Sequence, residues 1–176
     1  MTPQSVLSAD MQYWVAVAQL VGAIAVVVGA FVAIIAILCN GATAKKTQTA
    51  TFLFESKHDN GYWEGHKVIR KISESKTKSF IFYLEDALET EDAEDRRHIH
   101  YYLNFFERVA VSVKSKIYNE DMLKKVFYST AVKNYESAEP FIRGLRAKFN
   151  SQTYYQEYEW LVKRWKASPL KESNKK

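Results

Sequence analysis

The chain has 176 residues, a formal net charge of +5 and one cysteine, Cys39. This length excludes a multidomain protein, and a single cysteine excludes an internal disulfide, as expected of a cytosolic domain. Charge is unevenly distributed: all 25 Lys and Arg and 19 of the 20 acids follow residue 38, an excess of six cations there. The chain therefore has an N-terminal part with one charged side chain, Asp10, and a basic, polar remainder.

Residues 14–38 form an apolar run without a charge, and Gln19 is its only strongly polar member. As a helix with a rise of ~1.5 Å per residue, this run is about 37 Å long. A bilayer has a hydrocarbon core ~30 Å thick, so we expect a transmembrane helix over residues 13–39 after a short extracytoplasmic N-terminus, residues 1–12. A cleaved signal peptide is excluded, because no basic segment precedes the run and the run is too long.

The flanking charges predict the orientation of this helix. Residues 1–13 contain no Lys or Arg, whereas Lys45 and Lys46 follow the run. The positive-inside rule places these lysines and the rest of the chain in the cytoplasm. Trp14 fits the outer interface, where aromatic rings are enriched. We therefore expect a single-pass protein of the cell membrane, with the lipid bilayer as its first partner.

Small residues recur along the run at steps of three and four, which places them on one face of the helix. Such a face lets two helices approach closely in lipid, and Gln19 at its border can hydrogen-bond its symmetry mate. We expect a homo-oligomer packed through this face, although Ala and Gly are common in membrane spans anyway. A pore is not expected, because one polar side chain per helix cannot line it. The predicted face comprises Ala18, Gln19, Gly22, Ala25, Gly29, Ala33 and Ala36.

Residues 40–44 are expected to be a juxtamembrane linker in which Gly41 loosens the helix. Residues 45–58 favour a helix, although the alternating threonines at 47, 49 and 51 leave a strand as a competitor. A turn at Asn60-Gly61 precedes a second helix over residues 62–76.

The strongest helical signal covers residues 94–117, after a short apolar segment at 80–84 and an acidic stretch. Its apolar residues follow the i, i+3, i+4, i+7 pattern of a helix with one buried face. This helix is expected to be central in a bundle. The predicted buried residues are Ile99, Tyr102, Leu103, Phe106, Val109, Ala110 and Val113.

Local signals predict the remaining helices. Asn119 is a good N-cap for one helix, Pro140 fits the first position of another, and residues 153–156 match a capping box for the last. The predicted fold class is all-α: one N-terminal transmembrane helix followed by a cytoplasmic bundle of about five to six helices, residues 45–166. The basic tail, residues 167–176, is expected to be disordered.

Four blocks together resemble a known family: residues 102–110 (YLNFFERVA), 117–123 (IYNEDML), 140–146 (PFIRGLR) and 154–165 (YYQEYEWLVKRW). The chain is similar, over roughly residues 15–165, to the bacterial and phage family called domain of unknown function 4760. The resemblance implies one N-terminal span, a helical cytosolic domain and a bacterial inner membrane or phage setting, such as infection exclusion. It implies no activity, cofactor or catalytic residue.

Residues 96–100 (RRHIH) are the strongest candidate for chemistry. The helical ribonucleases known as HEPN domains carry Arg, four residues and then His; here both positions where that His would fall, Tyr101 and Tyr102, are tyrosine. His98 and His100 point about 200° apart on a helix, which does not suit joint metal ligation. No glycine-rich phosphate loop, nucleophile elbow or Cys/His ligand set occurs. We expect no enzyme activity, no cofactor and no metal.

Glu107 lies among apolar neighbours on the central helix, and a buried acid needs a partner. Arg143 and Arg146, about one turn apart on a later helix, are the expected partners in a structural ion pair, with Arg108 as a local alternative. On this hypothesis, replacing Glu107 by Gln costs more than ~1 kcal/mol of stability.

Aromatic and basic residues alternate near the C-terminus. Tyr154, Tyr158 and Trp165 are expected in the core, which leaves candidate partner contacts at Tyr155, Trp160, Lys163 and Arg164. The predicted function is that of a protein-interaction module that binds an unknown cytoplasmic protein. The alternative is a nucleic-acid or anionic-lipid binder that uses the basic surface; nucleic acid is not favoured, and a merely solvated basic surface is the simpler interpretation.

Overall fold

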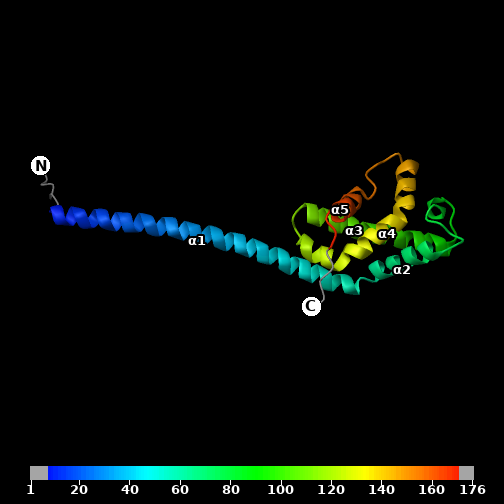
Figure 1. Cartoon of the computed structure of the whole chain (residues 1–176), viewed down its shortest axis with the longest axis horizontal. Coiled ribbons are helices and arrows are strands. Elements are labelled where there is room, and N and C mark those ends of the chain that lie inside the picture. The colour runs from blue at the N-terminus through cyan, green and yellow to red at the C-terminus, as the bar shows by residue number, and fades with distance from the viewer. Residues whose placement is uncertain (1–7, 171–176) are drawn as a thin grey trace. The chain divides into compact units, whose positions relative to one another are not determined.

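The computed structural model describes residues 8–170, and the predictions for residues 1–7 and 171–176 lie outside that range. The all-α prediction is confirmed (Figure 1). The chain divides into two compact units, Met1–Ala44 and Lys45–Lys176. The helices are α1 (Ala9–Glu55), α2 (Asn60–Glu74), α3 (Thr90–Lys114), α4 (Glu120–Lys148) and α5 (Gln156–Ala167), with 3-10 helices η1 (Ser56–His58) and η2 (Phe82–Leu84).

Helix α1 carries the apolar run, and within residues 8–170 it is the one helix long and apolar enough to cross a membrane. It continues through residues 40–44, so the loosening expected at Gly41 is not observed. A glycine costs a helix only ~1 kcal/mol, and extending an existing helix avoids the unfavourable nucleation of a new one. Residues 45–55 are therefore helical, and the competing strand is excluded.

Helix α3 is the centre of the second unit, as its sequence pattern predicts. All seven predicted core residues of this helix are buried. The helix ends where Lys116 adopts a left-handed conformation (φ 58°) and the amides of Ile117 and Tyr118 both turn back to the Ser112 carbonyl. Phe105 of α3 is buried as well, so the buried apolar face of α3 is wider than the seven predicted residues, and the other helices of this unit pack around it.

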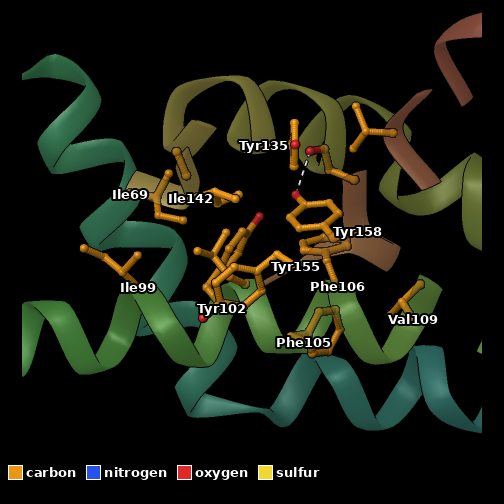
Figure 2. Close-up of a cluster of buried hydrophobic side chains, with 14 of the residues drawn as sticks. Ile69, Ile99, Tyr102, Phe105, Phe106, Val109, Tyr135, Ile142, Tyr155 and Tyr158 are labelled. Carbon is orange, nitrogen blue, oxygen red and sulfur yellow. Dashed lines mark hydrogen bonds between the residues drawn. The ribbon is translucent and has the colours of Figure 1, made fainter. Parts of the chain in front are cut away.

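Aromatic rings fill much of the core between α3 and its neighbours. Figure 2 shows Phe106 and Tyr158 side by side, with ring centroids 5.0 Å apart and planes 15° from parallel. Phe52, near the end of α1, stacks on Phe105 at 5.5 Å and on Tyr118 at 5.0 Å. Each such ring removes ~150–250 Å² from water, so these contacts hold the last turns of α1 and all of α5 on α3.

The N-cap predicted at Asn119 is confirmed. Its Oδ1 accepts the Met122 amide at 3.0 Å, as a helix cap should. The Asn119 amide donates at 2.7 Å to Oγ1 of Thr49, which is fully buried. The hydroxyl of Thr49 in turn donates to the Lys45 carbonyl at 2.7 Å. The start of α4 is thereby tied to the last turns of α1.

The helix start predicted at Pro140 is wrong, because Pro140 lies inside α4. Proline removes one backbone hydrogen bond and crowds the preceding turn, which bends a helix without necessarily ending it. Figure 1 shows α4 changing direction toward its C-terminal end. Ala138, Phe141 and Ile142 are all buried on the two sides of the proline, and their packing keeps the helix continuous through it.

Helices α2 and α3 lie in close contact at Gly65. A Cβ atom added there would lie 2.7 Å from both the His98 carbonyl oxygen and the Tyr102 Cβ. Backbone and Cβ atoms cannot move aside as the end of a flexible side chain can, so this contact requires glycine.

We predict that Gly65→Ala lowers the free energy of unfolding of the domain by about 1–3 kcal/mol, the usual cost of overpacking a core. Chemical denaturation in a non-ionic detergent, followed by tryptophan fluorescence, measures the change. Gly41→Ala is the control, because nothing lies within 4 Å of the added atom there. Equal stabilities of the two variants would contradict the packing argument.

Candidate interaction surface around Trp160

The first turn of α5 is capped by Glu107 of α3. The carboxylate accepts the Glu157 amide at 3.2 Å and the Tyr158 amide at 2.7 Å. The first amides of a helix have no partner within it and carry the positive end of its dipole. These two amides are the hydrogen-bond donors to the half-buried acid, and Arg146 acts on it only through its charge.

The predicted ion pair of Glu107 with Arg143 and Arg146 is therefore wrong. Arg143 pairs with Glu139 on its own helix at 2.9 Å. Arg146 pairs with Glu159 at 2.6 Å and donates two further bonds to the Tyr154 carbonyl, at 3.0 and 2.8 Å. Arg146 thus holds the α4–α5 loop and the outer side of α5.

The capping box expected at residues 153–156 is also replaced by the Glu107 cap. The Thr153 hydroxyl bonds to Ser151 at 2.8 Å, and α5 begins later, at Gln156. Tyr155 occupies the N-cap position in a left-handed conformation (φ 54°), with no capping bond from its side chain. The Glu107 carboxylate, distant in the sequence, accepts the first amides of α5, which is the capping role that the local pattern predicts for Thr153.

Tyr155 is not a surface contact residue, contrary to the prediction. Its residual exposure is 5%, and its hydroxyl lies 2.6 Å from Nδ1 of His100. The left-handed backbone turns the ring into the domain, where Figure 2 shows it among the core side chains. Nothing in the spacing of three nearby tyrosines distinguishes the inward from the outward ones.

Trp160 is half-buried on α5, and two cations lie over its ring. Lys114 Nζ is 5.5 Å and the Arg164 guanidinium carbon 5.7 Å from the ring centroid. A cation at this distance is attracted to the electron-rich ring face. Lys114 also pairs with Glu157 at 2.8 Å, which ties the tryptophan environment to the end of α3.

Trp160, Lys163 and Arg164 line one groove of about 750 Å³ between the start of α4 and α5. Three acids and three cations line it, so its charge is balanced. The structure brings together these three of the four predicted contact residues, and sequence reasoning missed the α4 side of the groove. The lining residues are Glu120, Asp121, Lys124, Gln156, Glu159, Trp160, Lys163, Arg164, Ala167 and Ser168.

The predicted cations of the groove are already paired. Arg164 forms a two-pronged bond to Glu120, at 2.8 and 3.0 Å, and Trp165 Nε1 donates to the same carboxylate at 3.2 Å. Arg164 holds the pKa of the Glu120 carboxyl below its usual value. Lys163 lies 2.5 Å from Glu159. Such a surface suits a polypeptide of mixed charge better than a polyanion, whose affinity comes from neutralising its phosphates.

The membrane-facing predictions concern α1. Trp14 is 67% exposed and contacts Tyr13 edge to face at 5.7 Å. Nothing lies within 4 Å of a Cβ added at Gly22 or Gly29, so the small-residue face is open. Lys45 and Lys46 continue the same helix. Self-association through this face stays a prediction.

The domain of α2 to α5 and most of the apolar run correspond to one protein family. The family described as "Domain of unknown function (DUF4760)" matches residues 23–165. The chain belongs to this family. The match confirms the family expected from the four sequence blocks. Neither the curated proteins nor the solved structures contain a match to the chain. Within residues 8–170, no group of three or more His, Cys, Asp or Glu side chains could hold a metal ion.

We predict that Glu107→Gln destabilises the domain by about 1–2 kcal/mol, because an amide offers one acceptor oxygen where two amides must be satisfied. Chemical denaturation measures the change. Glu139→Gln is the matched control: its carboxylate forms only a largely exposed pair with Arg143, so a change within ~0.5 kcal/mol is expected. Equal losses in both variants would refute the capping role.

Glu107 also predicts a pH dependence. Burial raises the pKa of its carboxyl above the ordinary value, against the opposing effect of the two amide bonds. The folded state thus retains the proton to higher pH than the unfolded state, so this group's contribution to stability falls as pH rises through the raised pKa. The stability of the wild type relative to Glu107→Gln should decrease from pH 4 to pH 7 in denaturation series. A rising difference would contradict the burial argument.

Proposed function

We propose that this protein is a single-pass membrane protein whose cytoplasmic helical domain binds another protein through the groove around Trp160. The observation that carries the proposal is the groove itself: an aromatic ring flanked by cations, set in a lining of balanced charge. Aromatic residues with a polar rim are typical of protein-binding surfaces. In the bacterial or phage setting that the family resemblance implies, infection sensing or exclusion is the proposed context.

The membrane part of the proposal is supported by α1. The helix is long and apolar enough to span, and cations flank it on one side only. On the positive-inside rule the N-terminus lies outside and the domain lies in the cytoplasm, at the inner membrane of a bacterium. An enzyme is not proposed, because no catalytic constellation supports one.

Self-association through the small-residue face is the second part of the proposal. Gly22 and Gly29 lie on this face with no neighbour within 4 Å of an added Cβ. Clustered domains would present several Trp160 grooves to one partner, which raises avidity without any new contact.

We predict that the detergent-solubilised protein is an oligomer and that Gly22→Leu/Gly29→Leu reduces it to a monomer, because the bulky side chains separate the helices. Light scattering with detergent correction measures the mass. Val27→Leu/Ile34→Leu, on the opposite face of the helix, should leave the oligomer intact. A monomeric wild type would contradict self-association and leave the transmembrane helix with the role of a membrane anchor alone.

We predict that a photo-crosslinking amino acid at position 160, introduced into the full chain in cells, forms a discrete adduct with one protein. The same amino acid at Val126, which is exposed but does not line the groove, should give none. Arg164→Ala should weaken the position-160 adduct, because it removes one side of the groove. Nuclease-sensitive adducts, or identical patterns at both positions, would contradict a protein partner.

The second candidate function is binding of nucleic acid or anionic lipid, which the six excess cations that follow the apolar run favour. Binding of this kind weakens steeply with salt, whereas capture through an aromatic groove is less affected. Repeating the crosslinking after washing the membranes at high salt separates the two.

A further inference from the structure

A second cavity, of about 370 Å³, lies between segments that are far apart in the sequence. The loop around η2, α3, the end of α4 and the α4–α5 loop all contribute to its lining. Its size is within the range of small-molecule sites. Three basic side chains line it: Arg96, His100 and Lys148. Two of them belong to the basic motif at residues 96–100, to which the proposed function assigns no role.

Arg96 and His100 are one turn apart on α3 and therefore share a face. Arg96 Nη1 donates to the Glu85 carbonyl at 2.8 Å. Lys148 Nζ donates to the Leu84 carbonyl at 2.7 Å. A backbone carbonyl orients each cation without carrying a charge of its own, so Arg96 has no carboxylate partner through this bond and Lys148 has one, Asp86.

His100 adds a third donor. Burial raises the pKa of the Tyr155 hydroxyl well above its usual value, which keeps the phenol protonated. This hydroxyl lies 2.6 Å from His100 Nδ1, and a protonated phenol can donate to that nitrogen in the tautomer in which Nδ1 carries no hydrogen. Burial, and then the charge of Arg96, lower the pKa of His100 and keep it neutral at pH 7. In that tautomer the ring hydrogen is on Nε2.

Nε2 of His100 is accessible. Within the described part of the chain, no buried side-chain nitrogen or oxygen lacks a hydrogen-bond partner. The bond of His100 uses Nδ1, so Nε2 is not a buried atom. His100 lines this cavity, and Nε2 is the ring nitrogen that its bond to Tyr155 leaves for a ligand.

Two aromatic rings complete the lining. Phe149, just after α4, is 54% exposed. Its ring centroid lies 5.6 Å from that of Tyr154, and both residues line the cavity. An exposed ring beside cations is a surface on which a flat ligand group can stack.

Asp86 is the one acid that lines the cavity, and it lies where an anion would. Its carboxylate pairs with Lys148, and Lys148 first, then Arg96, lower its pKa. Its side chain is 91% exposed, and water and salt screen an exposed ion pair of this kind, which makes it weak. An incoming anion can displace it at little cost.

We propose that this cavity binds a small monophosphate that carries an aromatic ring, with the phosphate on Arg96, His100 and Lys148 and the ring against Phe149 and Tyr154. The ligand class is that of a mononucleotide. Binding displaces the Asp86 carboxylate from Lys148. This site is separate from the Trp160 groove, since the two linings share no residue, and it stands whether or not the groove binds a protein.

Calorimetry on the full chain in neutral detergent tests the proposal with three probes: adenosine monophosphate, ribose 5-phosphate and adenosine. The monophosphate should bind with a Kd below ~1 mM. Ribose 5-phosphate should bind about tenfold more weakly, because it lacks a ring to stack. Adenosine should bind more weakly still, because it lacks the anion. No binding of the monophosphate, or equal binding of all three probes, would overturn the proposal.

Two variants with opposite expected effects locate the site. Lys148→Met should weaken binding of the monophosphate about tenfold or more, the value of one charge-assisted bond. Asp86→Asn should strengthen it about two- to fivefold, because it removes the competing carboxylate. This second variant changes a highly exposed side chain and leaves the fold intact, so misfolding cannot produce its effect.

Lys125→Met, at an exposed lysine outside both cavities, is the charge-matched control and should leave the affinity unchanged. Thermal melting of each variant verifies folding. If Lys148→Met and Lys125→Met weaken binding equally, or if Asp86→Asn does not strengthen it, the phosphate is bound by general surface charge and this site is excluded.

Discussion

The start of α5 depends on one long-range interaction, the carboxylate of Glu107 on the Glu157 and Tyr158 amides. This cap fixes both the residue at which α5 begins and the face that it turns to α3. Tyr155, immediately before the helix, is thereby directed to His100, and Trp160 is carried to the outer side of the domain. The cavity lined by Arg96, His100 and Lys148 and the Trp160 groove are thus both positioned by the same acid.

Arg146 supports the same region from the other side. Its guanidinium spans from the Tyr154 carbonyl to the Glu159 carboxylate. Tyr154 lines the cavity and Glu159 lines the groove, so one partly buried side chain contacts the rim of each site. Because the guanidinium has five donors in a rigid fork, it can hold a loop and a helix at once, which a lysine could not do with the same geometry.

The two sites differ in how their charges are arranged. In the groove, Arg164 and Lys163 are bound to carboxylates, so the surface offers an aromatic ring within a neutral environment. In the cavity, Arg96 is held by a backbone carbonyl, and Lys148 is held by a backbone carbonyl and by Asp86, the one acid of the lining, whose side chain is highly exposed. The first arrangement suits a protein partner and the second a small anion. The net charge of the chain does not reveal this difference between the two sites.

The sequence by itself determined the features that depend on neighbouring residues. The apolar run of α1, the buried face of α3 and the Asn119 cap are all written in local spacing, because helix periodicity and capping act over three or four residues. Membership of the family also follows from short blocks of sequence.

Only the tertiary structure decided the rest. The partner of Glu107 lies fifty residues away in the sequence. It is a pair of backbone amides at a helix start, not the expected arginines, and no sequence pattern indicates that these amides lack a partner within their own helix. Pro140 bends a helix that packing on both sides keeps whole. Tyr155 is buried, although the sequence analysis predicts it on the surface. In each case a long-range contact outweighs a local preference of about 1 kcal/mol, and such contacts exist only once the helices have packed.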